Sequence, residues 1–70
     1  MEKREEIKSL LRSNYLTQTW LIHNLERKGV KVDKTALSAI LANARRGEKC
    51  DLVIDTSLEI LYDYKIKFGL

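Results

Sequence analysis

This sequence contains a single histidine and a single cysteine, the two residue types that most often act as nucleophiles, bases or metal ligands. His23 falls within a helical stretch and has no second histidine with which to share a metal ion. Cys50 stands between Lys49 and Asp51, with no base beside it to form a thiolate. A general base also needs a hydrogen-bonded partner and a site that excludes water. We therefore predict no enzyme, no metal site and no cofactor, with His23 exposed and Cys50 a structural or surface thiol.

Charge is distributed unevenly along the chain. Residues 27–49 carry seven basic and two acidic side chains, a net charge of +5. Residues 1–26 are neutral overall, and residues 50–70 carry a net charge of −2. A positive field concentrated in the middle third is typical of a protein that binds an anionic partner such as nucleic acid. The alternative is an ordinary solvated surface of mixed charge.

Length and composition limit the architecture to one small domain spanning residues 1–70. The absence of proline and the presence of only three glycines favour helices. One cysteine cannot form an intrachain disulfide. The sequence has neither a signal-peptide pattern nor an apolar run long enough to span a membrane. We therefore expect a cytoplasmic protein with no membrane partner.

The spacing of apolar residues predicts an all-α domain of four to five helices. Thr17 and Asp33 are expected to cap the starts of the second and third helices, and Gly29 to end the second. A break at Asp55-Thr56 would divide the last helix and create a fifth. The predicted helices span about residues 2–13, 18–28, 34–44 and 48–65.

The inward faces of the second and third predicted helices define a shared core. Its expected members are Leu21, Leu25, Leu37, Ile40 and Leu41. Ala44 continues this face, and Arg45-Arg46 would lie in the last turn of the third helix, where its dipole favours cations. The final segment has two adjacent apolar faces, more than a core of this size needs. We expect part of it to meet a partner, for instance a second copy.

Several residues carry a resemblance to a known family. They are Leu16-Thr17-Gln18, Leu21-Ile22, Leu25, Asp33, Leu37-Ser38 and Ile40. In these residues the chain resembles the Cro/repressor (XRE-type) helix-turn-helix family of phage and bacterial regulators, over roughly residues 5–47. The resemblance implies a lambda-repressor-like domain with a central helix-turn-helix, whose third helix enters the major groove of double-stranded DNA. It also implies transcriptional regulation, with operator binding by a homodimer formed through the C-terminal helix.

The sequence departs from the family pattern in two respects. Seven residues separate Leu25 from Asp33, where the family usually places about two. The second helix should therefore be a turn longer, or the turn after it wider. The exposed face of the third helix is also composed of small side chains, without the Arg, Asn or Gln residues that read bases by paired hydrogen bonds. That face consists of Thr35, Ser38, Ala39 and Ala42.

Two sets of contact residues follow. Those expected to contact DNA are Thr17, Gln18, Lys34, Thr35, Ser38, Ala39, Asn43, Arg45 and Arg46. The alternative function is a protein-binding modulator, of the anti-repressor or anti-CRISPR type, that engages a phage repressor or another protein. The residues expected to contact a protein partner are Trp20, Ala42, Leu58 and Tyr62. Trp20 is expected either to cover the core near Ile7 or Tyr15 or to stand exposed as an anchor.

Overall fold

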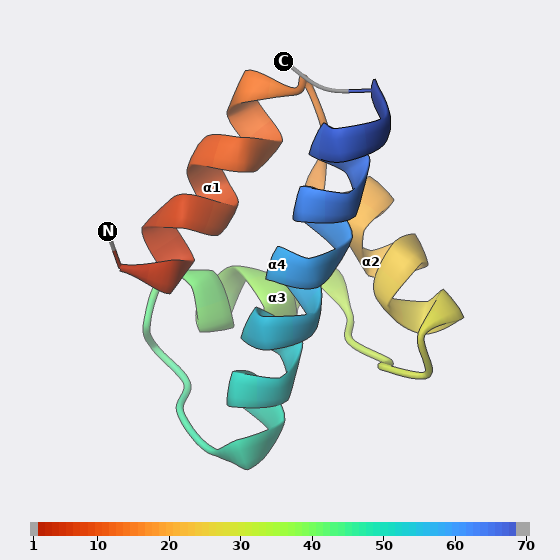
Figure 1. Cartoon of the computed structure of the whole chain (residues 1–70). Helices are drawn as coiled ribbons and strands as arrows, with labels where there is room; N and C mark the ends of the chain where they lie inside the picture. Colours follow the sequence, from red (N-terminus) through yellow and green to blue (C-terminus); the bar gives the residue numbers. More distant parts are fainter. Residues whose placement is uncertain (1, 69–70) are drawn as a thin grey trace.

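Four helices joined by three turns make up the protein (Figure 1). The computed structural model describes residues 2–68, and no strand occurs among them. The expectation of an all-helical chain is confirmed, with four helices rather than five. The helices are α1 (Lys3–Ser13), α2 (Gln18–Arg27), α3 (Lys34–Leu41) and α4 (Glu48–Phe68).

Side-chain caps fix where the first three helices begin. The Thr17 hydroxyl accepts a hydrogen bond from the Trp20 backbone N–H at 3.1 Å. The Asp33 carboxylate accepts one from the Ala36 backbone N–H at 2.6 Å. Each cap satisfies a backbone donor that the first helical turn leaves without a partner. Both caps were predicted from the sequence and are confirmed.

All three turns after these helices use the same backbone arrangement. The residue after each C-cap has a positive φ: Tyr15 at 58°, Gly29 at 83° and Asn43 at 61°. At the end of α2, Gly29 N–H bonds to the Glu26 carbonyl and Val30 N–H to the Leu25 carbonyl, both at 2.9 Å. This pair of bonds is the Schellman motif, which ties off the last carbonyls of a helix. Gly29 therefore ends α2, as predicted.

The third helix is shorter than predicted. It ends at Leu41 because Asn43 adopts the left-handed conformation and Ala44 N–H bonds back to the Ala39 carbonyl at 2.8 Å. Asparagine tolerates this conformation better than most residues. Ala44 is consequently exposed instead of continuing the buried face, which corrects that expectation. Arg45 and Arg46 lie in the loop before α4 and not in the last turn of α3.

The fourth helix is continuous through Asp55-Thr56, so of the two alternatives the four-helix arrangement is the one observed. Val53, Ile54 and Ser57 on either side of this pair are buried, which keeps one face of α4 against the core. Asp55 itself is exposed and forms an ion pair with Lys3 of α1 at 3.0 Å. The packing of the flanking residues therefore keeps Asp55-Thr56 helical, although Asp and Thr have only a weak preference for helices.

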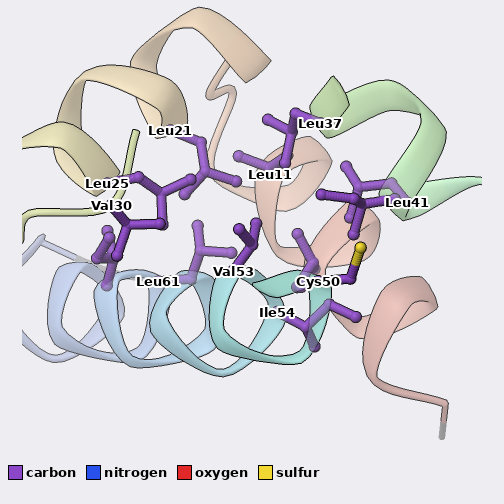
Figure 2. Packing of buried hydrophobic residues seen from close by; sticks show 13 residues of the cluster. Leu11, Leu21, Leu25, Val30, Leu37, Leu41, Cys50, Val53, Ile54 and Leu61 are labelled. Carbon is purple, nitrogen blue, oxygen red and sulfur yellow. The ribbon is translucent and has the colours of Figure 1, made fainter. Parts of the chain in front are cut away.

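One apolar core joins all four helices (Figure 2). The five residues predicted from the second and third helices are confirmed as core members, with Leu21, Leu25 and Leu37 fully buried. α1 contributes Ile7 and Leu11 to the same cluster. The residues that α4 contributes to the cluster are Cys50, Val53, Ile54, Ile60 and Leu61.

α3 lies across the ends of α1 and α2 and packs against both (Figure 1). Its C-terminal end is held by α1, because Arg4 Nε donates a hydrogen bond to the Ile40 carbonyl at 3.0 Å. Such a bond satisfies one of the carbonyls that a helix end leaves unpaired. With eight residues and one buried face, α3 leaves its other face open to solvent.

Candidate nucleic-acid interface

The solvent-facing side of α3 is the face that the sequence predicted. Thr35, Ser38 and Ala42 are exposed, and Ala39 is half-buried. These four residues face away from the core because Leu37, Ile40 and Leu41 occupy the opposite side of the helix. The result is a narrow helical surface made of hydroxyl and methyl groups. A backbone this lightly covered can approach a partner closely.

One flank of this face is bounded by the start of α2. The Ser38 hydroxyl donates a hydrogen bond to Gln18 Oε1 at 2.9 Å. Gln18 is the first residue of α2, directly after the Thr17 cap. Because the Thr17 cap takes only the Trp20 N–H, helix geometry leaves the N–H groups of Gln18 and Thr19 free to meet an anion. The structure thus brings Thr17, Gln18 and Ser38 together.

The other flank is bounded by basic residues around a shallow depression. Lys31 from the α2–α3 turn, Arg45 from the α3–α4 loop and Lys49 from α4 line this depression together with Ala36 of α3. Two acidic side chains, Glu26 and Asp33, line it as well, so the basic residues outnumber the acidic ones by one. Ala36 and Ser38 lie on opposite edges of the exposed face, because a step of two residues turns an α-helix by slightly more than half a turn. Groups that can bind an anion therefore border α3 on both sides. We call Lys31, Arg45 and Lys49 the basic rim.

The positive charges near α3 form no ion pairs within residues 2–68. The four ion pairs among residues 2–68 join Lys3 to Asp55, Arg4 to Glu2, Lys8 to Glu5 and Lys28 to Glu59. None of these pairs uses a residue of the basic rim, Lys34 or Arg46. The Arg46 guanidinium Nε donates a hydrogen bond to the Asn43 side-chain carbonyl at 3.3 Å, which involves no opposite charge. These cations remain available to an external anion.

Comparisons of this chain with family models, with curated proteins and with solved structures gave no match. The chemistry of the surface is therefore the only guide to function.

Lys31 and Lys49 were not among the predicted contact residues. Periodicity assigned them to a connector and to the start of the last helix, and gave no reason to place them near α3. The signal that was present is the net charge of residues 27–49, to which both contribute. Only the fold shows that these two lysines and Arg45 all lie beside α3.

The predicted protein-binding residues differ in exposure and in the residues they contact. Trp20 is half-buried and packs edge-to-face on Tyr64, with ring centroids 5.3 Å apart. Trp20 packs against the core, as one of the two expectations for it has it, but Tyr15 takes no part because it is 90% exposed. Leu58 is half-buried at the edge of the core, whereas Ala42 is exposed at the end of α3. The remaining member, Tyr62, donates a hydrogen bond from its hydroxyl to Glu6 of α1.

His23 and Cys50 occupy different environments. His23 is exposed on α2, and Cys50 is buried and 8% exposed in the core. Within residues 2–68, no three His, Cys, Asp or Glu side chains cluster as a metal site would require. None of the helices in this part of the chain combines the length and the apolar character needed to cross a bilayer.

Proposed function

We propose that this chain binds double-stranded DNA and acts as a small transcriptional regulator, with α2 and α3 serving as a helix-turn-helix. The observation that carries this proposal is the placement of anion-binding groups on both flanks of α3. Gln18 and the start of α2 border one side, and the basic rim borders the other. A helix in the major groove lies between two phosphate backbones, so it needs such groups on each side.

The α3 face supplies the groups that would read base edges. Thr35 and Ser38 carry hydroxyls, which donate to or accept from base atoms in the major groove. Ala39 presents a methyl group suited to the methyl of thymine. Because these side chains are short, α3 must enter the groove deeply, and the phosphate contacts then carry most of the affinity. In agreement with this role, the chain's positive charge is concentrated around α3.

The wide turn fits the same arrangement. α2 ends at Arg27, so the additional residues relative to the family pattern extend the turn and not the helix. The turn places the exposed Lys31 beside Ala36 of α3. In this proposal the insertion adds a phosphate contact without changing the faces of the two helices.

A homodimer would increase affinity by presenting two copies of α3 to neighbouring turns of the DNA. The outward side of α4 carries exposed Leu52, Tyr62 and Ile66 at helical spacing. Of the three acidic side chains between Leu52 and Ile66, Asp55 pairs with Lys3 and Glu59 with Lys28, whereas Asp63 forms no ion pair among the described residues. Repulsion between two such faces would therefore come from Asp63 alone. Sedimentation of the protein alone and of Ile66→Glu, which should be monomeric, tests this step.

The decisive experiment measures DNA affinity as a function of salt concentration. Random-sequence duplex and duplex from upstream of the gene provide the two probes. Each phosphate contact contributes about 0.9 to the slope of log affinity against log salt, so Arg45→Ala and Arg46→Ala should each reduce the slope by about one. Lys65→Ala removes an exposed lysine of α4 outside the basic rim and should leave the slope unchanged. No binding to either duplex at moderate salt would refute the proposal.

A second candidate function has its own supporting observation. The exposed face of α3 has no long side chain, and faces of this kind also suit close packing against a protein helix. Under this alternative the chain would be a modulator that engages a repressor or another protein, as anti-repressors do. The two functions predict opposite effects for enlarging Ala39.

A further inference from the structure

A second surface feature lies between α2 and the C-terminal half of α4, apart from the α3 face. Here the two helices border an open groove of about 590 Å³. The residues that line its floor include Trp20 of α2 and Tyr64 and Phe68 of α4. By helical rotation, α2 directs Gln18 toward α3 and Trp20 toward this groove. The groove is therefore separate from the proposed DNA interface.

The aromatic rings form a continuous strip along the groove. Trp20 packs edge-to-face on Tyr64, with an angle of 79° between the ring planes. Tyr64 in turn meets Phe68, with ring centroids 5.0 Å apart. Trp20 and Tyr64 are half-buried, and Phe68 is 71% exposed. Partly exposed aromatic residues that already hold one another in place are typical anchors for a protein partner, because little side-chain entropy is lost on binding.

The charges around the strip are mostly positive. Arg27 on α2 and Lys67 on α4 lie on its two sides, and neither forms an ion pair among the described residues. Lys28 also lines the groove, but its ammonium group is bound to Glu59 at 2.8 Å. The one acidic lining residue, Asp63, forms no ion pair among the described residues, and the raised pKa of Lys28 comes mainly from the Glu59 hydrogen bond. With Lys28 paired, Arg27 and Lys67 exceed Asp63 by one positive charge, which is available to an external group.

We propose that this groove binds an acidic amphipathic segment of a partner protein. A large apolar side chain of that segment would lie on the aromatic strip, and its carboxylates would pair with Arg27 and Lys67. The groove is open to solvent and bordered by two helices, which suits a peptide helix better than an enclosed small molecule. This inference does not depend on DNA binding by α3.

Trp20 provides a direct readout, because it is the only tryptophan in the chain. The probe is a tryptophan-free helical peptide with Leu and Phe one turn apart and Glu at the flanking positions. Its titration should produce a saturable change in Trp20 fluorescence. The same peptide with Lys in place of each Glu should bind at least tenfold more weakly, since it places like charges beside Arg27 and Lys67. Equal binding of the two peptides, or no change with either, would overturn the proposal.

Charge reversals on α4 provide a matched pair of variants. Lys67→Glu should weaken binding of the acidic peptide at least tenfold. Lys65→Glu changes the net charge equally but lies outside the groove, so it should have little effect. Both side chains are exposed, and circular dichroism would verify that both variants fold. Equal losses in the two variants would show that only net charge matters and would overturn the site.

Phe68→Ala and a dilution series complete the test. Removing the exposed Phe68 ring should weaken binding of the acidic peptide without unfolding the protein. Wild-type Trp20 emission should not depend on protein concentration in the absence of peptide. If emission changes with dilution and the protein sediments as a dimer, a second copy occupies the groove, and the proposal of an acidic partner fails.

Discussion

The Ser38 hydroxyl and the Gln18 side-chain carbonyl lie 2.9 Å apart, joining α3 to the first residue of α2. Ser38 is exposed and Gln18 is half-buried, so their hydrogen bond lies at the surface. A bond in this position orients the Gln18 amide group along the flank of α3. Its Nε2 then remains free to donate to a phosphate or a base edge.

The first prediction concerns whether the Gln18–Ser38 hydrogen bond serves DNA binding or the stability of the fold. Gln18→Ala and Ser38→Ala should each change the free energy of unfolding by no more than about 1 kcal/mol, because a solvent-exposed hydrogen bond is largely replaced by water. Both should nevertheless weaken DNA binding, and Ser38→Ala should also alter base preference. Urea unfolding and fluorescence anisotropy measure the two effects. Wild-type DNA affinity in both variants would remove the pair from the interface.

A substitution at Ala39 distinguishes the two candidate functions. In a groove about 12 Å wide, Ala39→Gln should maintain or raise DNA affinity and change the preferred sequence. In a tight protein contact, the same enlargement should cost about 1–3 kcal/mol of binding free energy. DNA affinity and binding to a neighbouring repressor should be measured on the same preparation. Loss of repressor binding with unchanged weak DNA affinity would favour the modulator.

Removing one core leucine should threaten the whole fold. Leu37 is fully buried among residues of the core cluster. Leu37→Ala should lower the free energy of unfolding by about 2–5 kcal/mol, a large share of the total for a small domain. Leu52→Ala, at a side chain that is 53% exposed, should change it by less than about 0.5 kcal/mol. Equal urea midpoints for these two variants would contradict the described core.

The buried Ser57 hydroxyl is expected to lower stability. Its side chain is 0% exposed, and within residues 2–68 its oxygen has no hydrogen-bond partner. An unsatisfied buried hydroxyl costs about 1–3 kcal/mol, so Ser57→Ala should raise the unfolding midpoint in urea. Ser13→Ala, on the exposed last residue of α1, serves as the control and should change the midpoint little. A lower midpoint for Ser57→Ala would show that the hydroxyl is satisfied.

The Tyr62–Glu6 contact predicts a stability change at alkaline pH. The hydrogen bond to Glu6 raises the pKa of the Tyr62 phenol above its usual 10.0. The folded state therefore favours the protonated phenol. This contribution is complete below the unfolded pKa and is lost as pH rises through the higher folded value. Glu6→Gln should bring the Tyr62 pKa back toward 10.0, as measured by NMR titration with Tyr62→Phe to assign the signal. An unchanged pKa would exclude the contact.

Local sequence was sufficient to determine where α2 and α3 begin, where α2 ends and which residues form their buried faces. Thr17, Asp33 and Gly29 act through bonds within a few residues of themselves, so their effects can be predicted without a fold. The apolar spacing of Leu21, Leu25 and Leu37 likewise reports which side of each helix avoids water. The exposed face of α3 follows from the same spacing, because it consists of the residues that do not belong to the buried face of that helix.

Tertiary packing decided the rest. Whether Asp55-Thr56 breaks a helix depends on Val53 and Ser57 being buried by other elements, which a local pattern does not contain. Trp20 faces Tyr64, a residue 44 positions away, and the basic rim brings Lys31 and Lys49 together on one flank of α3. Contacts between distant residues depend on how the amphipathic helices pack against one another. Many packing arrangements bury the same apolar faces, so the apolar pattern does not select one of them. The sequence alone thus determined the helices and their charges, and only the tertiary structure decided which of those charges share a surface.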